Sequence, residues 1–230
     1  MLDPFTELGN IDPESTVGIR GAALTAIDVM LTLTAGRGGR FTEDVYQPCG
    51  LEPAKIYPTS RSGRFIQLKT DPAQGAEREI LKKFERKIPR ITTVAELKKL
   101  LADAASALCG EEFAWEMLRP ADDPAAELAE SLRNPRRPQQ AVGMVWRELY
   151  SAIVERVSFS EFSTSPEFHE LARLLESFAF GAPAQQIRKI FALVDAGIVD
   201  FSYLGSAEGC PADIWVDAVL ATPGISLGTL

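Results

Sequence analysis

The chain has 230 residues, of which 46% are hydrophobic and 24% charged, so it is long enough to bury a core as one large domain or as one domain with an insertion. Its formal net charge of −8 argues against nucleic acid or an anionic membrane as a general partner, because both require a positive protein face. No stretch is apolar for the length of a membrane span and the N-terminus lacks a signal-peptide pattern, so we expect a cytoplasmic protein.

Cysteine and histidine are too sparse to indicate a metal site or a nucleophilic triad. Cys49, Cys109 and Cys210 are odd in number, widely separated and in no CxxC arrangement, so we expect reduced thiols and no zinc. His169 is the only histidine, and no Ser, Cys or Asp accompanies it in a triad pattern. We therefore expect a surface histidine, and the sequence assigns no catalytic residue and no metal ligand.

Early in the chain, the residues follow the pattern of a strand, a tight turn and a helix. Val17 and Ile19 are β-branched and apolar, Gly21 follows them, and apolar residues at helical spacing predict a helix over 22–34 that ends at Gly36. A glycine at a strand end can take a positive φ, and the helix behind it directs N–H groups and its positive dipole end toward a phosphate. The pattern predicts the start of a βαβ unit.

This turn partly matches the fingerprint of dinucleotide-binding proteins, which has glycine or a small residue at the first, third and sixth positions. Gly21, Ala23 and Ala26 occupy these positions. The match is incomplete, because Ala23 carries a methyl group where the backbone must approach a pyrophosphate. An ordinary strand-to-helix turn of an α/β protein is the alternative. No Walker-type lysine indicates a nucleoside triphosphatase.

With Thr25 and Asp28 added, the turn resembles the second, NAD(P)H-type fingerprint of two-dinucleotide flavoproteins. More closely, the chain resembles a bacterial family of FAD/NAD(P)-binding proteins related to flavin-dependent N-hydroxylating monooxygenases. The resemblance continues in a Gly-Arg-Gly-Gly-Arg-Phe loop at 36–41 and a Ser-Arg-Ser-Gly loop at 60–63, and it extends along most of the chain.

The resemblance implies that the turn binds NADP or NAD. Backbone or hydroxyl donors of Gly21, Ala23, Leu24 and Thr25 would face the pyrophosphate, and Asp28 would order the turn or the helix start. The family also uses FAD, which accepts a hydride from the nicotinamide. Because no Gly-rich FAD fingerprint precedes the turn, we expect FAD only if a missing N-terminal domain is present, and we expect this chain to be a fragment.

Arginines follow the turn in two loops. Arg37 and Arg40 lie in a Gly-rich loop where a guanidinium could donate two N–H groups to a phosphate or carboxylate; a solvated loop is the alternative, favoured more for Arg37. Ser60, Arg61 and Arg64 follow a short predicted strand, and in a doubly wound sheet this loop lies beside the adenosine ribose. Donors there favour the 2′-phosphate of NADP, and a surface turn with exposed arginines is an equally good interpretation.

The middle of the chain shows almost only helix signals. Thr93 and Glu96 form a capping-box pattern, and Ser165 before Pro166 predicts another helix start. An apolar stripe at helical spacing predicts one helix over 139–157. These stripes are typical of helix cores, and a substrate pocket is the less favoured interpretation.

Further strands are predicted on both sides of this helical stretch. Alternating residues at 65–69 predict a half-buried strand. A helix over 184–196 closed by Gly197 precedes apolar runs at 198–204 and 214–220, which predict a β-hairpin-like pair.

We therefore predict an α/β fold, namely a Rossmann-like nucleotide-binding lobe with a large all-helical insertion. The lobe comprises residues 16–70 and 184–230, the insertion is 71–183, and residues 1–15 form a linker. Pro223 interrupts a terminal turn that resembles the one closing such a lobe.

The predicted function is the NAD(P)H-binding lobe of a flavin-dependent oxidoreductase, in which hydride passes from NADPH to FAD. We expect this chain to be inactive by itself. Its partners would be a dinucleotide and an FAD-binding domain. The alternative is a non-enzymatic protein-interaction module on a relic nucleotide-binding scaffold. A self-sufficient dehydrogenase would need an acid or base at the hydride site, and the sequence shows none.

Overall fold

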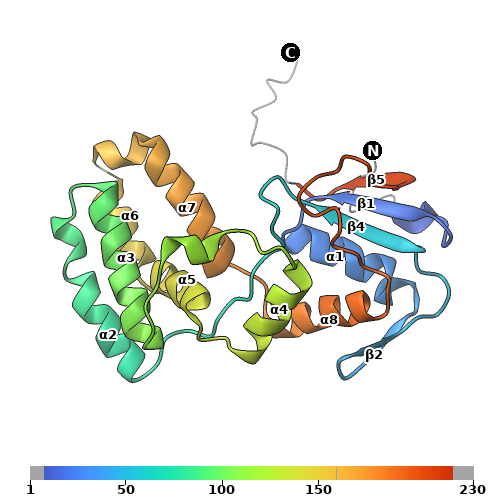
Figure 1. Cartoon of the computed structure of the whole chain (residues 1–230), viewed down its shortest axis with the longest axis horizontal. Coiled ribbons are helices and arrows are strands. Elements are labelled where there is room, and N and C mark those ends of the chain that lie inside the picture. Colours follow the sequence, from blue (N-terminus) through green and yellow to red (C-terminus); the bar gives the residue numbers. More distant parts are fainter. Residues whose placement is uncertain (1–7, 159, 220–230) are drawn as a thin grey trace, which may run out of the picture. The chain divides into compact units, whose positions relative to one another are not determined.

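A computed structural model describes residues 8–158 and 160–219 of the chain. The protein is mixed α/β and divides into two compact units (Figure 1). Unit 1 comprises the described residues up to Phe65 and those from Ala192 onward, and unit 2 comprises Ile66–Phe191.

Unit 1 contains a three-stranded parallel sheet in the order β4-β1-β5 (Figure 1). The strands are β1 (Thr16–Arg20), β4 (Lys55–Thr59) and β5 (Ile214–Asp217). Val17 and Ile19 of the central strand β1 are completely buried, as expected of a strand that is covered on the face they occupy. The strand predicted around Val17 and Ile19 and the short strand predicted before Ser60 are therefore confirmed.

A short extended segment, 198–200, adds to the outer edge of β4. The N–H of Ile56 donates to the carbonyl of Ile198, the N–H of Asp200 donates to the carbonyl of Ile56, and Val199 forms a parallel bridge with Ile56. The parallel arrangement of chain segments in unit 1 is thus 198–200, β4, β1, β5.

The predicted hairpin between 198–204 and 214–220 is wrong. Its first segment is extended only beside β4, whereas β5 lies on the other side of β1. The connecting loop returns along the sheet: Ser60 at the carboxyl end of β4 donates to the carbonyl of Leu204, and Asp213 donates to the carbonyl of Thr16 at the amino end of β1. A connection that returns to the amino end produces parallel strands, whereas a hairpin needs a tight turn.

Helix α1 (Leu24–Leu33) follows β1, as predicted, and buries one face that includes Ile27 and Met30. It ends before Gly36, because the hydroxyl of Thr34 donates to the carbonyl of Met30 and a 3-10 turn, η2 (Ala35–Arg37), continues the chain. The glycine that ends this segment in the left-handed conformation is Gly38, the C-cap of η2, with φ 115°. The prediction that Gly36 ends the helix is therefore wrong.

A small antiparallel hairpin completes unit 1. It consists of β2 (Arg40–Thr42) and β3 (Val45–Gln47), and the ring of Phe41 packs on that of Tyr46 with centroids 4.9 Å apart. A short 3-10 helix, η1 (Leu8–Asn10), precedes β1.

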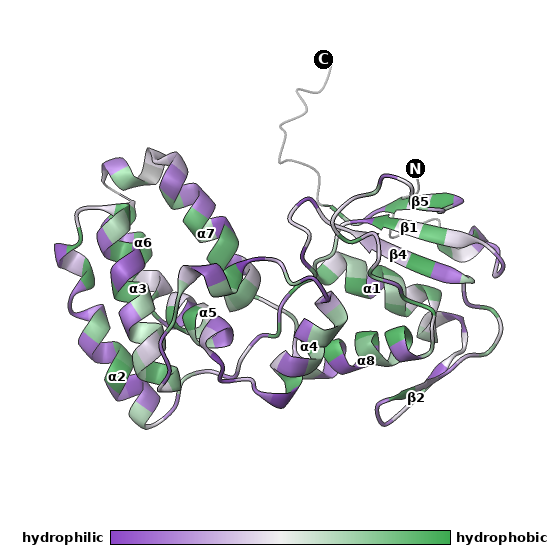
Figure 2. Ribbon diagram, viewed as in Figure 1, coloured by the Kyte–Doolittle hydropathy of each residue, from purple (hydrophilic) through white to green (hydrophobic). Residues whose placement is uncertain are grey.

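Unit 2 is helical. Its core contains the facing sides of α3, α5 and α7, and Figure 2 shows hydrophobic and hydrophilic residues interleaved along these helices, as amphipathic helices require. The helices are α2 (Ala76–Glu85), η3 (Ile88–Arg90), α3 (Val94–Cys109), η4 (Trp115–Leu118), α4 (Pro124–Arg133), α5 (Pro138–Glu148), α6 (Tyr150–Val157), η5 (Glu161–Thr164) and α7 (Pro166–Ala179), and α8 (Ala184–Asp195) continues into unit 1.

Two helix starts in unit 2 confirm the sequence patterns. Thr93 and Glu96 form a reciprocal capping box at α3, and the Ser165 hydroxyl accepts the N–H of Phe168 at α7. The single helix predicted over 139–157 is instead two helices, because Leu149 leaves helical geometry at φ −93° and ψ 1°.

The strand predicted over 65–69 is also wrong. Only Leu68 forms a bridge, with Ala182, although two backbone hydrogen bonds join Lys69 and Gln67 to the same alanine. Because this partner segment is extended for only a few residues before α8 begins, no ladder develops.

Candidate functional site

The turn after β1 is the centre of the candidate site. Gly21 has φ 131°, and a Cβ atom placed on it would lie 2.8 Å from the carbonyl oxygen of Ala218. The N–H of Gly21 donates to Thr59 at the end of β4, and the N–H of Ala218 donates to Arg20, both at 2.9 Å. The turn is therefore clamped between the carboxyl ends of β4 and β5, where only glycine fits.

The helix behind this turn begins without a side-chain cap. Its N-cap residue is Ala23, at φ −108° and ψ −160°, and no acidic residue lies in the first turn. The N–H groups of Leu24 and Thr25 find no acceptor among the described residues, and Leu24 is 46% exposed. Unsatisfied N–H groups and a positive dipole end at an exposed helix start suit an anion.

Two further residues of the fingerprint differ in burial. Ala26 is completely buried. It occupies the third small-residue position of the fingerprint, where the helix packs closely on the sheet. Asp28 is exposed, and its carboxylate contacts no partner in the described part of the chain; only its backbone carbonyl accepts the Thr32 hydroxyl.

The loop after β4 reaches the same edge of the sheet. The Thr59 hydroxyl donates to the Ile19 carbonyl at 3.0 Å, and Ser60 and Ser62 join their hydroxyls at 2.8 Å in a tight turn that Gly63 completes with φ 67°. Arg61 is exposed on this turn, and Arg64 is half-buried. The structure thus brings the Gly21 turn and the Ser60 loop together through the Thr59 backbone.

Arg40 does not lie at this edge. It is exposed on β2, beyond the far end of α1, and a ten-residue helix is about 15 Å long. The neighbouring Arg37 does not have the solvated side chain of the alternative interpretation, because its guanidinium donates to the carbonyls of Leu51 and Leu8 at 2.9 and 2.8 Å.

A buried carboxylate explains why this Gly-rich loop is ordered. Glu52 accepts the Tyr46 hydroxyl at 2.7 Å and the N–H groups of Cys49 and Gly50 at 2.9 and 2.8 Å. Burial by itself would raise the pKa of Glu52, but these hydrogen bonds outweigh it and lower that pKa to about 2. Burial, and then the Glu52 contact, raise the pKa of Tyr46. A Cβ on Gly39 would collide with both side chains, so this loop is built around structural groups.

The carboxyl ends of β1 and β5 also hold a group that the sequence reasoning missed. Arg20 and Asp217 are register partners, with Nη1 and Oδ1 3.7 Å apart, and the Arg20 guanidinium lies 5.0 Å from the ring centroid of Trp215. The available signal was the run Val-Gly-Ile-Arg, in which an arginine closes an otherwise apolar strand, but its partners lie almost 200 residues away.

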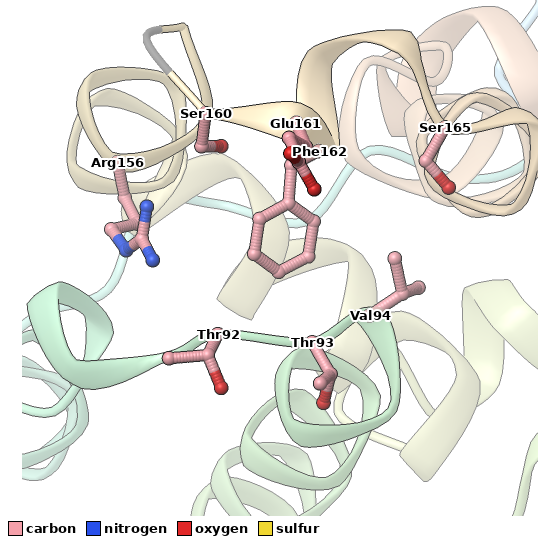
Figure 3. A pocket seen from close by; sticks show the side chains of 8 residues that line it. All are labelled: Thr92, Thr93, Val94, Arg156, Ser160, Glu161, Phe162 and Ser165. Carbon is pink, nitrogen blue, oxygen red and sulfur yellow. The ribbon is translucent and has the colours of Figure 1, made fainter.

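Unit 2 has a separate open pocket of roughly 340 Å³ between α3, α6 and α7 (Figure 3). The hydroxyls of Thr93 and Ser165 cap helices there, and the Arg156 guanidinium lies 5.7 Å from the Phe162 ring centroid. Most of its polar groups therefore stabilise the unit itself. The lining residues are Thr92, Thr93, Val94, Arg156, Ser160, Glu161, Phe162 and Ser165.

His169 is exposed on α7, as predicted, and Cys49, Cys109 and Cys210 are free thiols. Within residues 8–158 and 160–219, no three His, Cys, Asp or Glu side chains group as a metal site would require. The helices of that part of the chain are too short or too polar to cross a bilayer. Pro223 lies outside the described residues.

These features define unit 1 as a parallel α/β protein with a glycine turn and an uncapped helix at the carboxyl edge of its sheet. The chain is similar to a nitrosuccinic acid synthase, npaA, of Aspergillus oryzae, with 40% identity over 74 residues, or 30% of this chain and 11% of that protein. It is also similar to an L-aspartate N-monooxygenase (nitrosuccinate-forming) of Streptomyces davaonensis, with 35% identity over 112 residues, or 47% of this chain and 16% of that protein.

The chain is thus a distant, partial homologue of an L-aspartate N-monooxygenase and matches only a small part of the length of these relatives. No family model matches it. The predicted kinship with N-hydroxylating monooxygenases is supported at this coarse level.

Proposed function

We propose that unit 1 is the NAD(P)H-binding lobe of a flavin-dependent oxidoreductase, in which NADPH delivers a hydride to FAD. The observation that carries the proposal is the uncapped start of α1 behind a turn that admits only Gly21. The names of the two relatives, an N-monooxygenase and a nitrosuccinic acid synthase, support oxidative chemistry on a nitrogen-bearing substrate in the protein to which the lobe belongs.

The order of parallel segments supports a Rossmann-like lobe. From one edge it is 198–200, β4, β1, β5, which corresponds to the order 3-2-1-4 of a doubly wound sheet. The chain leaves β1 toward β4 on one side and later reaches β5 on the other. A ligand in such sheets binds beyond the carboxyl ends at this switch point, which is where Gly21 lies.

The residues of this edge fit a dinucleotide. The N–H groups of Leu24 and Thr25 would hold the pyrophosphate, and the methyl group of Ala23 would weaken this contact without closing it, because Ala23 is exposed. Ser60 and Arg61 would hold the adenosine end, with Arg61 donating to the 2′-phosphate of NADP. Arg64 and Asp28 would support the two loops, and Arg40 would not take part.

The bound dinucleotide would supply the hydride, and the lobe would orient the nicotinamide and exclude water. We place FAD in a separate domain, since the one glycine turn of this kind in the described residues is already used. We also propose that the protein lies in the cytoplasm and does not bind nucleic acid.

A non-enzymatic interaction module is the alternative, and one feature of unit 2 favours it. Tyr150, Val154 and Phe180 are 38%, 40% and 41% exposed, and the rings of Tyr150 and Phe180 lie 5.7 Å apart. Neighbouring exposed aromatic and aliphatic side chains are typical of protein contacts.

Calorimetric titration of the chain and of Ala23→Gly with NADPH and NADH tests the proposal. We expect NADPH to bind and Ala23→Gly to bind it several-fold more tightly, because the backbone then approaches the pyrophosphate more closely. If neither protein binds either dinucleotide, the lobe assignment fails and the interaction module becomes the better account.

A further inference from the structure

The carboxyl ends of β1 and β5 carry an arrangement that the function proposed above leaves unused. Gly18 pairs in register with Trp215, and Arg20 pairs with Asp217, so all four residues face the same side of the sheet. A Cβ on Gly18 would lie 2.6 Å from an atom of the Trp215 ring, so the indole lies directly on the β1 backbone. Because Gly18 has no side chain, the indole has room beside β1, and the Arg20 guanidinium lies over the indole ring.

Arg20 is held in place but retains donors. Its guanidinium lies 5.0 Å from the Trp215 ring centroid and 3.7 Å from the Asp217 carboxylate, which is longer than a hydrogen bond, and its side chain is 43% exposed. A guanidinium has five N–H donors, and those of Arg20 have no hydrogen-bond acceptor among the described residues. A stacked and paired arginine is oriented in advance, which lowers the entropy lost when it binds an anion.

The position of Arg20 along the sheet indicates what it binds. It precedes Gly21 directly, at the carboxyl ends where the proposed dinucleotide lies, and the stretch 21–36 contains no lysine or arginine. With the adenosine end over the Ser60 loop after β4, the rest of the ligand crosses β1 toward β5. The N–H groups of α1 carry no formal positive charge. With these groups alone, the second negative charge of the pyrophosphate would have no cation beside it.

We propose that Arg20 binds the nicotinamide-side phosphate of the dinucleotide, with Trp215 and Asp217 as positioning residues. This inference rests on the proposed function. It assigns the two arginines of the site to opposite halves of one ligand: Arg61 to the adenosine half and Arg20 to the nicotinamide half.

Half-ligands separate these two assignments. Binding of NADPH, NADH, reduced nicotinamide mononucleotide and 2′,5′-ADP is measured for the chain, Arg20→Gln and Arg61→Ala. Arg20→Gln should weaken NADPH and NADH equally, by about tenfold or more, and abolish detectable mononucleotide binding while leaving 2′,5′-ADP unchanged. Arg61→Ala should weaken 2′,5′-ADP and leave the mononucleotide unchanged. Arg188→Gln, an exposed arginine of unit 2, controls for the lost charge.

The positioning role has its own readout. Trp215→Leu should weaken NADPH binding in the chain but not further in Arg20→Gln, because the indole acts through the guanidinium. Trp215→Phe should retain most of the affinity. Thermal unfolding confirms that each variant folds.

Each outcome is decisive. If the chain binds NADPH and Arg20→Gln binds it equally well, or loses 2′,5′-ADP to the same degree, the Arg20 assignment is overturned and the lobe assignment stands. If the chain and Ala23→Gly bind no dinucleotide, both proposals fall.

Discussion

The carbonyl oxygen of Ala218 lies 2.8 Å from the point that a Cβ atom on Gly21 would occupy, although the two residues are far apart in the sequence. Gly21 also has φ 131°, which L side chains rarely adopt. Both the backbone angle and the packing of β5 therefore require glycine at the turn before α1.

Gly21→Ala should lower the free energy of unfolding by about 2 to 4 kcal/mol, because it combines backbone strain with a clash against backbone atoms that cannot move aside. Urea denaturation measures the change. Gly50→Ala is the matched control: Gly50 has φ 84° but open space around its Cβ position, so the expected loss is only about 1 to 2 kcal/mol. Equal losses in the two variants would contradict the contact with Ala218.

Glu52→Gln should destabilise the protein by about 1 to 3 kcal/mol at neutral pH, because the amide cannot accept all the hydrogen bonds that the carboxylate accepts. The folded pKa is lowered from 4.5 to about 2, so the contribution of the carboxylate is present above the unfolded value and is lost as the pH falls toward 2. The stability difference between the two proteins, measured by denaturation between pH 7 and pH 2, should therefore shrink below pH 4.5.

Tyr46→Phe refines this test. It removes one donor to the Glu52 carboxylate, so the folded pKa of Glu52 should rise toward its unfolded value. The acid-dependent loss of stability should still begin near pH 4.5, but it should be smaller and complete at a higher pH. An unchanged acid profile would show that the backbone N–H groups alone hold the carboxylate.

Gly143→Ala in α5 should destabilise unit 2 by about 1 to 3 kcal/mol, since a Cβ there would lie 2.7 Å from the Cβ of Phe178 and 2.9 Å from its carbonyl oxygen on α7. Helix propensity alone predicts the opposite sign, a gain of about 1 kcal/mol. Urea denaturation decides between them. Phe178→Ala should not rescue the variant, because the obstructing atoms are the Cβ and the backbone.

Arg61→Ala should weaken NADPH binding by about tenfold and leave NADH binding nearly unchanged, because only NADPH carries the 2′-phosphate that the guanidinium would hold. Titration with both dinucleotides measures this ratio. Lys82→Ala, an exposed cation of unit 2, should leave the ratio unaltered. A parallel loss for both dinucleotides would place Arg61 elsewhere in the site.

Elements whose signals are local were predicted well. The strand, Gly21 and α1 follow one another within a few residues, and the Thr93–Glu96 capping box involves only neighbours on one turn of helix. The strand predictions were wrong where an apolar run was assigned to a strand without knowledge of the segment that it would pair with. Residues 65–69 and 198–204 have strand-like composition, but each meets a partner segment only briefly. Pairing partners cannot be inferred from composition, because the same alternation suits any neighbouring strand.

The sequence alone determined the glycine at the strand end, the small residues after it and the cationic loop at 60–64, because each depends on backbone freedom or side-chain chemistry within a short stretch. Only the tertiary structure decided that Arg40 lies away from the turn and that Arg20 lies beside Trp215 and Asp217. The physical reason is that parallel strands need long connections, so the groups that meet at the carboxyl edge of the sheet come from distant parts of the chain.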